Sequence, residues 1–304
     1  MDKIEAILCI YTYFCYICKI NLGFMEISTA KIEALRELIA TPRSIVILSH
    51  TNPDGDAVGS SLAWAEILRK QGHEVTCILP NRYPYYLEFM PNISSVVIFK
   101  YDDKGAAKEA LKRADIIFCL DFHLLSRLDQ LGDLIDENQH AKRVLIDHHL
   151  DASEDFDLML SYPKASSTCY LVALLVERLF GIEHISCEMA ENLFVGMMTD
   201  TGNFAFSSVT PDVFRVVSLL AETGISIPDI HNHVYNSFTE GRARLFGYVI
   251  NRKMKIFHGG TVAHMSLTED EMRRFWFQQG DSEGFVNYPL TIKKMKMSAM
   301  FTQH

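Results

Sequence analysis

Imidazoles and carboxylates follow three short apolar runs of the sequence. The runs 45–48, 116–120 and 144–146 lead into the segments His50-Thr51-Asn52-Pro53-Asp54-Gly55-Asp56, Asp121 and Asp147-His148-His149. A fourth acidic segment, Thr199-Asp200-Thr201-Gly202, ends a stretch of helical periodicity. Imidazole combined with several carboxylates suits manganese and similar divalent ions. A pair of ions needs a bridging carboxylate, and Asp121, which stands alone after its run, is the natural candidate.

The elements that must position these residues alternate along the chain. Apolar runs typical of buried strands occupy 44–49, 75–79, 96–99, 116–120 and 144–146, and helical patterns occupy 28–40, 59–71, 106–113, 167–180, 186–198 and 211–222. This alternation predicts an α/β fold, a parallel sheet with helices on both faces. The carboxyl ends of parallel strands share one edge, where ligands bind. Three distant segments would therefore deliver their side chains to one place.

Each segment alone also has an ordinary structural interpretation. A D-x-D loop is usually a turn or a helix cap, a lone Asp after a strand is often an N-cap, and adjacent histidines are often surface or core residues. Met197 and Met198 are interpreted as packing residues, and His231 and His233 as solvated. The joint occurrence of these segments at successive strand ends favours a site.

The length of 304 residues favours two domains. We expect a catalytic domain at 25–223, a linker at 224–241 and a smaller, incomplete α/β unit at 242–304. In the small unit, strands at 255–258 and 261–265 flank Gly259-Gly260, a hairpin signal, and a helix covers 269–277. Residues 1–24 are expected to be an extension outside the fold, with Met25 as the true start, and a membrane anchor is the alternative.

Bulk composition limits the partners. The net charge of −9 disfavours binding of long nucleic acid, although bound cations would allow a short anionic ligand. Seven cysteines, mostly in apolar runs, suit a reducing cytoplasm. We therefore expect a cytoplasmic location, no membrane partner and no long duplex partner, and a homodimer stays open.

The motifs together resemble the DHH phosphoesterases, whose name matches the triplet Asp147-His148-His149. The segment 50–60 resembles the first motif of that family, Asp121 with Arg127 the second, and Asp200 the fourth. The resemblance covers about residues 40–304 and implies two manganese ions. It assigns His50, Asp54 and Asp121 to one ion, and Asp56, Asp121, His148 and Asp200 to the other. His149 would contact the scissile phosphate or assist proton transfer, Arg127 would contact substrate, and Asp147 would orient an imidazole.

The segment 283–290 resembles the DHH-associated domain of the branch that degrades very short RNAs. By similarity, the enzyme would release 5'-mononucleotides from the 3' end of short oligoribonucleotides and remove the 3'-phosphate of 3'-phosphoadenosine 5'-phosphate. The Arg-Ser and Gly-Gly-Gly-His segments of that domain do not occur before His304, so the associated domain is expected to be incomplete. A cyclic-dinucleotide phosphodiesterase, an inorganic pyrophosphatase and a weakly active nucleotide-binding remnant are the alternatives.

Overall fold

The computed structural model describes residues 25–303, which divide into two compact units. Unit 1 contains residues 25–82 and 90–227, and unit 2 contains residues 83–89 and 228–303. The extension expected at 1–24 lies outside the described residues. Over the described range, no helix combines the length and the apolar character needed to cross a membrane.

Unit 1 is built on a six-stranded sheet in which every neighbouring pair of strands is parallel. The strands are β1 (Ser44–Leu48), β2 (Glu74–Leu79), β3 (Val97–Ile98), β4 (Ile116–Leu120), β5 (Lys142–Asp147) and β6 (Leu158–Ser161). Their order in the sheet is β3-β2-β1-β4-β5-β6. The order changes direction between β1 and β4, and in open α/β sheets ligands bind outside the carboxyl ends at such a switch point.

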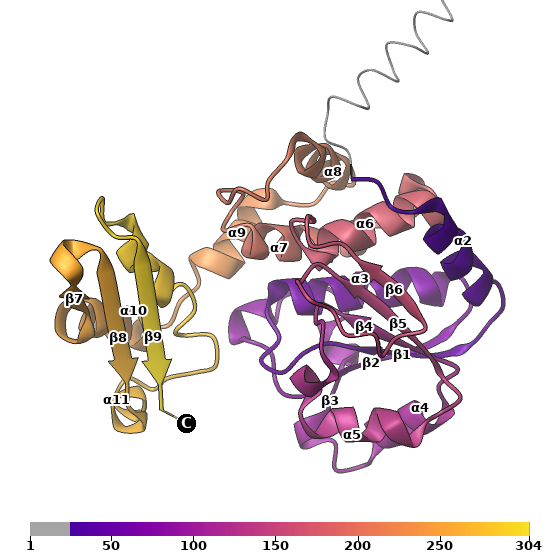
Figure 1. Ribbon diagram of the computed structural model, residues 1–304, viewed down its shortest axis with the longest axis horizontal. Coiled ribbons are helices and arrows are strands. Elements are labelled where there is room, and N and C mark those ends of the chain that lie inside the picture. Colours follow the sequence, from indigo (N-terminus) through magenta and orange to yellow (C-terminus); the bar gives the residue numbers. More distant parts are fainter. Residues whose placement is uncertain (1–24, 304) are drawn as a thin grey trace, which may run out of the picture. The chain divides into compact units, whose positions relative to one another are not determined.

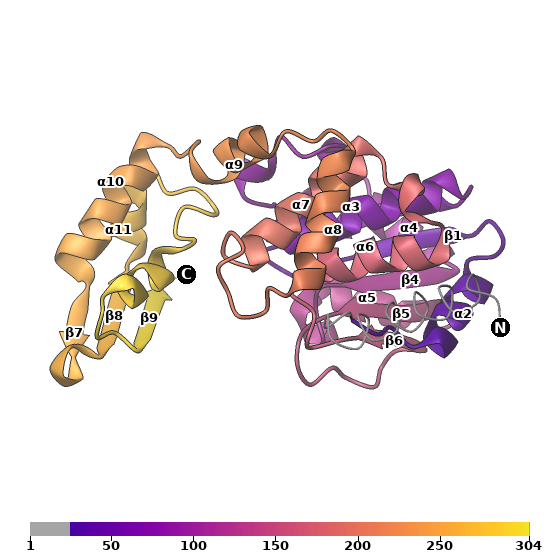
Figure 2. The ribbon, with the colours of Figure 1, turned by 90° about the horizontal axis from the view of Figure 1, so that it is seen from above.

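Helices cover both faces of this sheet (Figures 1 and 2), so the predicted fold class is confirmed. One face carries α3 (Gly55–Lys70), α6 (Thr168–Leu179) and α7 (Cys187–Asp200), and the other carries α4 (Ala106–Arg113) and α5 (Gln130–Glu137). Helix α2 (Thr29–Leu38) contacts β6 and α6, and α8 (Pro211–Glu222) packs on α6 and α7. Strands buried on both faces have no polar alternation, which explains the uninterrupted apolar runs.

Alternate residues of β4 show how the two faces are filled. Ile117 and Cys119 join the core beneath α4 and α5. Phe118 points the other way and meets Trp64 of α3 edge to face, with ring centroids 5.5 Å apart. The site-bearing strand ends are thus held between two apolar layers.

Three elements of unit 1 differ from the sequence prediction. Helix α3 begins at Gly55, four residues before the predicted start, because Asp54 caps it and accepts hydrogen bonds from the backbone N–H groups of Asp56 and Ala57. Asp56 therefore lies in the first helical turn and not in a loop. Helix α5 and strand β6 were not predicted, since the first carries a glycine and the second has only four residues.

Glycines allow α3 and α7 to pack closely. A Cβ atom at Gly59 would lie 2.3 Å from the carbonyl oxygen of Asn192. One at Gly196 would lie 2.2 Å from the sulfur of Cys169 and 2.9 Å from the Cα of Asp56. This close approach sets Asp56 against α6 and α7.

Unit 2 has a three-stranded sheet in the order β7-β8-β9. Strands β7 (Lys255–Phe257) and β8 (Val262–Leu267) form the antiparallel hairpin that Gly259-Gly260 predicted, and β9 (Met297–Thr302) runs parallel to β8. The helices are α9 (Ile227–Tyr235), α10 (Glu240–Tyr248) and α11 (Glu269–Arg274). Leu245, Val249, Met265, Leu267 and Phe285 form its core.

The segment 83–89 belongs to unit 2 although it lies between β2 and β3 in the sequence. The Tyr86 hydroxyl donates to the carboxylate of Glu283, and the ring of Phe89 stacks on that of His233 with centroids 4.3 Å apart. The chain passes from one unit to the other at 82/83, 89/90 and 227/228. The prediction of one linker between two domains did not anticipate the crossings at 82/83 and 89/90.

The two tryptophans offer a matched test of the α3 contact. Trp64 is fully buried, so Trp64→Ala should lower the free energy of unfolding by about 3–5 kcal/mol. Trp276 is 74% exposed, and Trp276→Ala should change it by no more than about 0.5 kcal/mol. Urea unfolding followed by circular dichroism measures both, and equal effects would contradict the packing described.

The α3/α7 contact predicts that Gly196→Ala destabilises unit 1 by about 1–3 kcal/mol, because the added methyl group overlaps Cys169 and Asp56. Gly247→Ala is the control, since nothing lies within 4 Å of the added atom and alanine suits the interior of α10. Thermal unfolding of both variants gives the comparison. A Gly196→Ala protein as stable as the wild type would refute the close approach.

Candidate metal centre

The predicted site residues converge at the carboxyl ends of β1, β4 and β5 and at the end of α7. Among four groups of three ligand-bearing residues that the described part of the chain forms there, two hold the predicted metal ligands, and in each group the ligand atoms lie within 4.8 Å of one another. One group is His50, Asp54 and Asp121; the other is Asp56, His148 and Asp200. These six residues come from four separate parts of the sequence, and both groups carry the mixed nitrogen and oxygen donors that divalent transition ions accept.

Asp121 belongs to the first group and also reaches the second. Its Oδ2 is 3.5 Å from His50 Nε2, and its Oδ1 is 3.5 Å from His148 Nε2. The two oxygens of this carboxylate therefore face a histidine of each group, as a bridging ligand requires. Asp121 holds this position with φ +65°, a left-handed conformation that Asp tolerates better than most residues.

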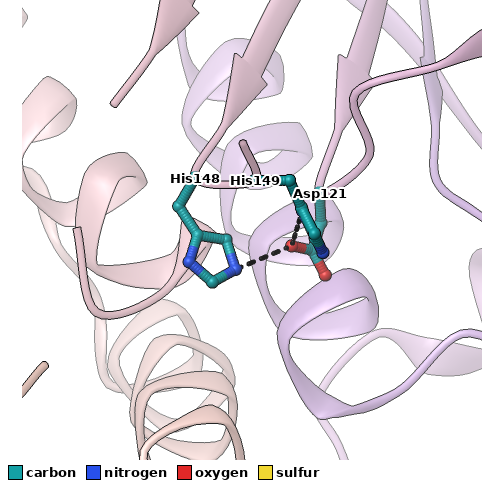
Figure 3. Close-up of side chains that lie close together, drawn as sticks. All are labelled: Asp121, His148 and His149. Carbon is teal, nitrogen blue, oxygen red and sulfur yellow. Dashed lines mark ion pairs between the residues drawn. The ribbon is translucent and has the colours of Figure 1, made fainter. Parts of the chain in front are cut away.

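His148 is surrounded by acidic side chains. Its Nε2 lies 3.5 Å from Asp121 Oδ1, as Figure 3 shows. It also lies 3.8 Å from Asp56 Oδ2 and 3.5 Å from Asp200 Oδ2. Burial lowers the pKa of His148, but these carboxylates outweigh it and raise the pKa to about 10. The surrounding carboxylates therefore favour a positive charge at the position of the His148 ring.

His149 contacts Asp147 through both its ring and its backbone. Its Nδ1 lies 2.7 Å from Asp147 Oδ1, and its backbone N–H donates to Asp147 Oδ2. The hydrogen bond to Asp147 raises the pKa of His149, although burial opposes it. Nδ1 is engaged in this way, so Nε2 of the half-exposed ring is left for another partner.

The carboxylates repel one another. The pKa of Asp56 is raised well above the usual range, mainly by burial and further by the charges of Asp121 and Asp200. Burial also raises the pKa of Asp54, and of Asp200 to about 7. Burial acts in the same direction on Asp121, yet His148 and His50 lower its pKa overall.

These charges bear on whether a metal would fit. The two groups together hold four buried or half-buried carboxylates and two imidazoles, so negative charge is in excess. Bound divalent cations would offset that excess. Without such cations, the carboxylates would have to bind protons to reduce the buried negative charge. The donor set and its electrostatics therefore fit a pair of divalent ions.

Arg127 lies at the edge of the first group. It comes from the short helix Leu125–Leu128, its backbone carbonyl accepts the N–H of Thr51, and its Nη2 is 3.2 Å from His50 Nδ1. Its exposed guanidinium can interact with an anion at the rim.

Two residues near the site were not singled out from the sequence. His123 stacks on His149, with centroids 5.4 Å apart and planes at 26°, and forms a third group with Asp147 and His149. Thr168, at the start of α6, donates its hydroxyl to Asp121 Oδ1. The sequence signal for Thr168 was the pattern Ser166-Ser167-Thr168 before a buried helix. The only sequence signal for His123 was its closeness to Asp121.

The pKa of Asp200 predicts how stability depends on pH without metal. A carboxyl near 3.8 in the unfolded chain and about 7 in the folded one binds more protons when folded, so stability is lost as pH rises through 7. His148 acts in the same direction between 6.5 and about 10. From pH 5 to 8 we expect the metal-free protein to lose on the order of 2 kcal/mol, allowing for partial exposure of Asp200.

Asp200→Asn removes the titrating carboxyl and should flatten that pH dependence. Urea unfolding at several pH values, with chelator present, measures the slope for both proteins. An unchanged slope in the variant would show that Asp200 does not carry the effect.

Known proteins share this fold and these segments. Residues 44–197 match the model of the DHH family, N-terminal domain. The crystal structure of an exopolyphosphatase-related protein from Bacteroides fragilis superposes with a TM-score of 0.87 at 37% identity, over 92% of this chain and 82% of that one.

Among curated proteins, the bifunctional oligoribonuclease and PAP phosphatase NrnA of Thermus thermophilus is 29% identical over 82% of this chain and 69% of its own length. The Bacillus subtilis protein of the same name is 26% identical over 86% of this chain and 78% of its own. The cyclic-di-AMP phosphodiesterase PdeA of Listeria monocytogenes is 26% identical over 79% of this chain but only 36% of its own length. The match of the family model to half of the sequence, together with these relatives, shows that the chain belongs to the DHH family.

Proposed function

We propose that this protein is a phosphoesterase that uses two divalent metal ions, with manganese as the preferred pair. The observation that carries the proposal is Asp121, whose two oxygens face His50 on one side and His148 on the other. His50, Asp54 and Asp121 would hold one ion, and Asp56, Asp121, His148 and Asp200 the other. When bound, such a pair supplies Lewis-acid activation of a phosphoryl group and of the attacking water.

The remaining residues act on the substrate and its protons. His149 has its Nδ1 turned to Asp147, so its Nε2 is the atom to contact the scissile phosphate or to transfer a proton. Asp147 fixes the ring from a fully buried position. The guanidinium of Arg127 provides a positive charge at the rim for a second phosphate.

We propose short oligoribonucleotides, cut from the 3' end to 5'-mononucleotides, and 3'-phosphoadenosine 5'-phosphate as substrates. The names of the Thermus and Bacillus relatives support this choice, since both are oligoribonucleases and PAP phosphatases that match most of this chain. A small anionic substrate also suits a protein with a net charge of −9, because the ions and not a basic surface would attract it.

A second candidate is hydrolysis of a cyclic dinucleotide. The similarity to PdeA supports it, but that match covers just over a third of the relative. Both activities would use the same metal centre and differ in how the base and sugar are held.

A substrate panel tests the proposal. With manganese present we expect turnover of a diadenylate and release of phosphate from 3'-phosphoadenosine 5'-phosphate, with slower or no turnover of cyclic di-AMP and pyrophosphate. Chelator should abolish the activity and added manganese should restore it. Turnover of cyclic di-AMP alone would favour the second candidate, and turnover of nothing in the panel would contradict both.

Asp121→Ala should abolish turnover of every substrate, lowering it by more than about 100-fold, because the carboxylate that faces both His50 and His148 is lost. Asp129→Ala is the control, since Asp129 is exposed and belongs to neither group. Steady-state rates of the two variants and the wild type give the comparison. A near-wild-type rate for Asp121→Ala would refute the bridging role.

A further inference from the structure

Thr168 touches two of the proposed metal ligands at once. Its hydroxyl donates to Asp121 Oδ1 at 3.0 Å, and its backbone N–H donates to Asp56 Oδ2 at 2.6 Å. The next N–H, of Cys169, donates to Asp56 Oδ1 at 2.8 Å. Thr168 is completely buried, so no water competes for these bonds.

The start of α6 explains why these donors are available. The first N–H groups of a helix have no acceptor within the helix. Ser167 caps α6 by accepting the N–H of Tyr170, which leaves the N–H groups of Thr168 and Cys169 for Asp56. A carboxylate from α3 thus serves as the acceptor for another helix.

These bonds restrict how both carboxylates can turn. Each carboxylate oxygen accepts about two bonds, and α6 occupies one position on each oxygen of Asp56 and one on Asp121 Oδ1. Two of these oxygens also lie near His148 Nε2, which is 3.5 Å from Asp121 Oδ1 and 3.8 Å from Asp56 Oδ2. The hydroxyl of Thr168 is the contact that links Asp121 to the helix that holds Asp56.

We propose that Thr168 is a positioning residue for the metal pair, which fixes the bridging carboxylate of Asp121 relative to Asp56. The proposal rests on the proposed function, because it concerns ligands of the proposed ions. The hydroxyl holds Asp121 Oδ1 toward the His148 group, while Oδ2 stays 3.5 Å from His50 Nε2 in the other group. Loss of the hydroxyl leaves the N–H bonds to Asp56 in place and frees Asp121 to rotate.

Thr168→Val tests this role, since it replaces the hydroxyl by a methyl group of similar size. Partners that orient metal ligands typically change metal affinity by about 10–100-fold. We expect manganese titration, followed by electron paramagnetic resonance, to show weaker binding by that factor and loss of the spin-coupled signal of an ion pair. Thr168→Ser keeps the hydroxyl and should restore both.

Ser61→Ala is the matched control. The Ser61 hydroxyl is also buried, but it donates only to the backbone carbonyl of Ala57 and touches no proposed ligand. This variant should bind manganese as the wild type does. The manganese-induced rise in unfolding temperature provides a second readout, because a merely structural role of Thr168 would lower stability with and without metal by the same amount.

The outcomes separate this inference from the proposed function. Wild-type manganese affinity and an intact pair signal in Thr168→Val would overturn the role of Thr168 and leave the metal centre standing. A wild-type protein that binds no pair of ions would overturn the proposed function itself. Should Thr168→Val not fold, Thr168→Ala, which adds no atoms, is compared with Thr168→Ser by the same titration, and equal affinities would overturn the inference.

Discussion

The excess of negative charge around Asp121 is the constraint on which the rest of unit 1 depends. Asp54, Asp56, Asp121 and Asp200 meet in a part of the protein where burial penalises every unbalanced charge. His50 and His148 balance only part of it. A fold that brings buried carboxylates together is destabilised by their mutual repulsion. Clusters of this kind, with perturbed pKa values, are typical of functional sites.

The sheet topology and the ends of three helices together hold the four carboxylates in place. The change of strand order between β1 and β4 opens a position where His50 and Asp121 leave neighbouring strands. Asp54 caps α3, the first N–H groups of α6 hold Asp56, and α7 ends at Asp200. Glycine contacts between α3 and α7 make the approach close enough for these ends to share one cluster. The carboxylates are therefore fixed by the backbone as much as by one another.

Much of unit 1 could be predicted from the sequence because each strand buried on both faces leaves a continuous apolar run. The ends of those runs marked His50, Asp121 and the segment 147–149, and the parallel arrangement predicted that they would meet. The register of Asp56 was not predicted, because only the capping by Asp54 shows that α3 starts at Gly55. Thr168 and His123 were missed for another reason. The pattern of residues 166–168 marks a helix start, but the contacts of Thr168 with Asp121 and of His123 with His149 cross the fold and cannot be read from the sequence. The segment 83–89 likewise joins unit 2 through Tyr86 and Glu283, nearly two hundred residues apart in the sequence.

A crystal structure with manganese, analysed by anomalous diffraction, is the most direct measurement of the central claim. We expect two anomalous peaks in each chain, one beside His50 and Asp54 and one beside Asp56, His148 and Asp200, with an oxygen of Asp121 bound to each. A single peak, or two peaks that do not share Asp121, would contradict the bridged pair on which the proposed function is based.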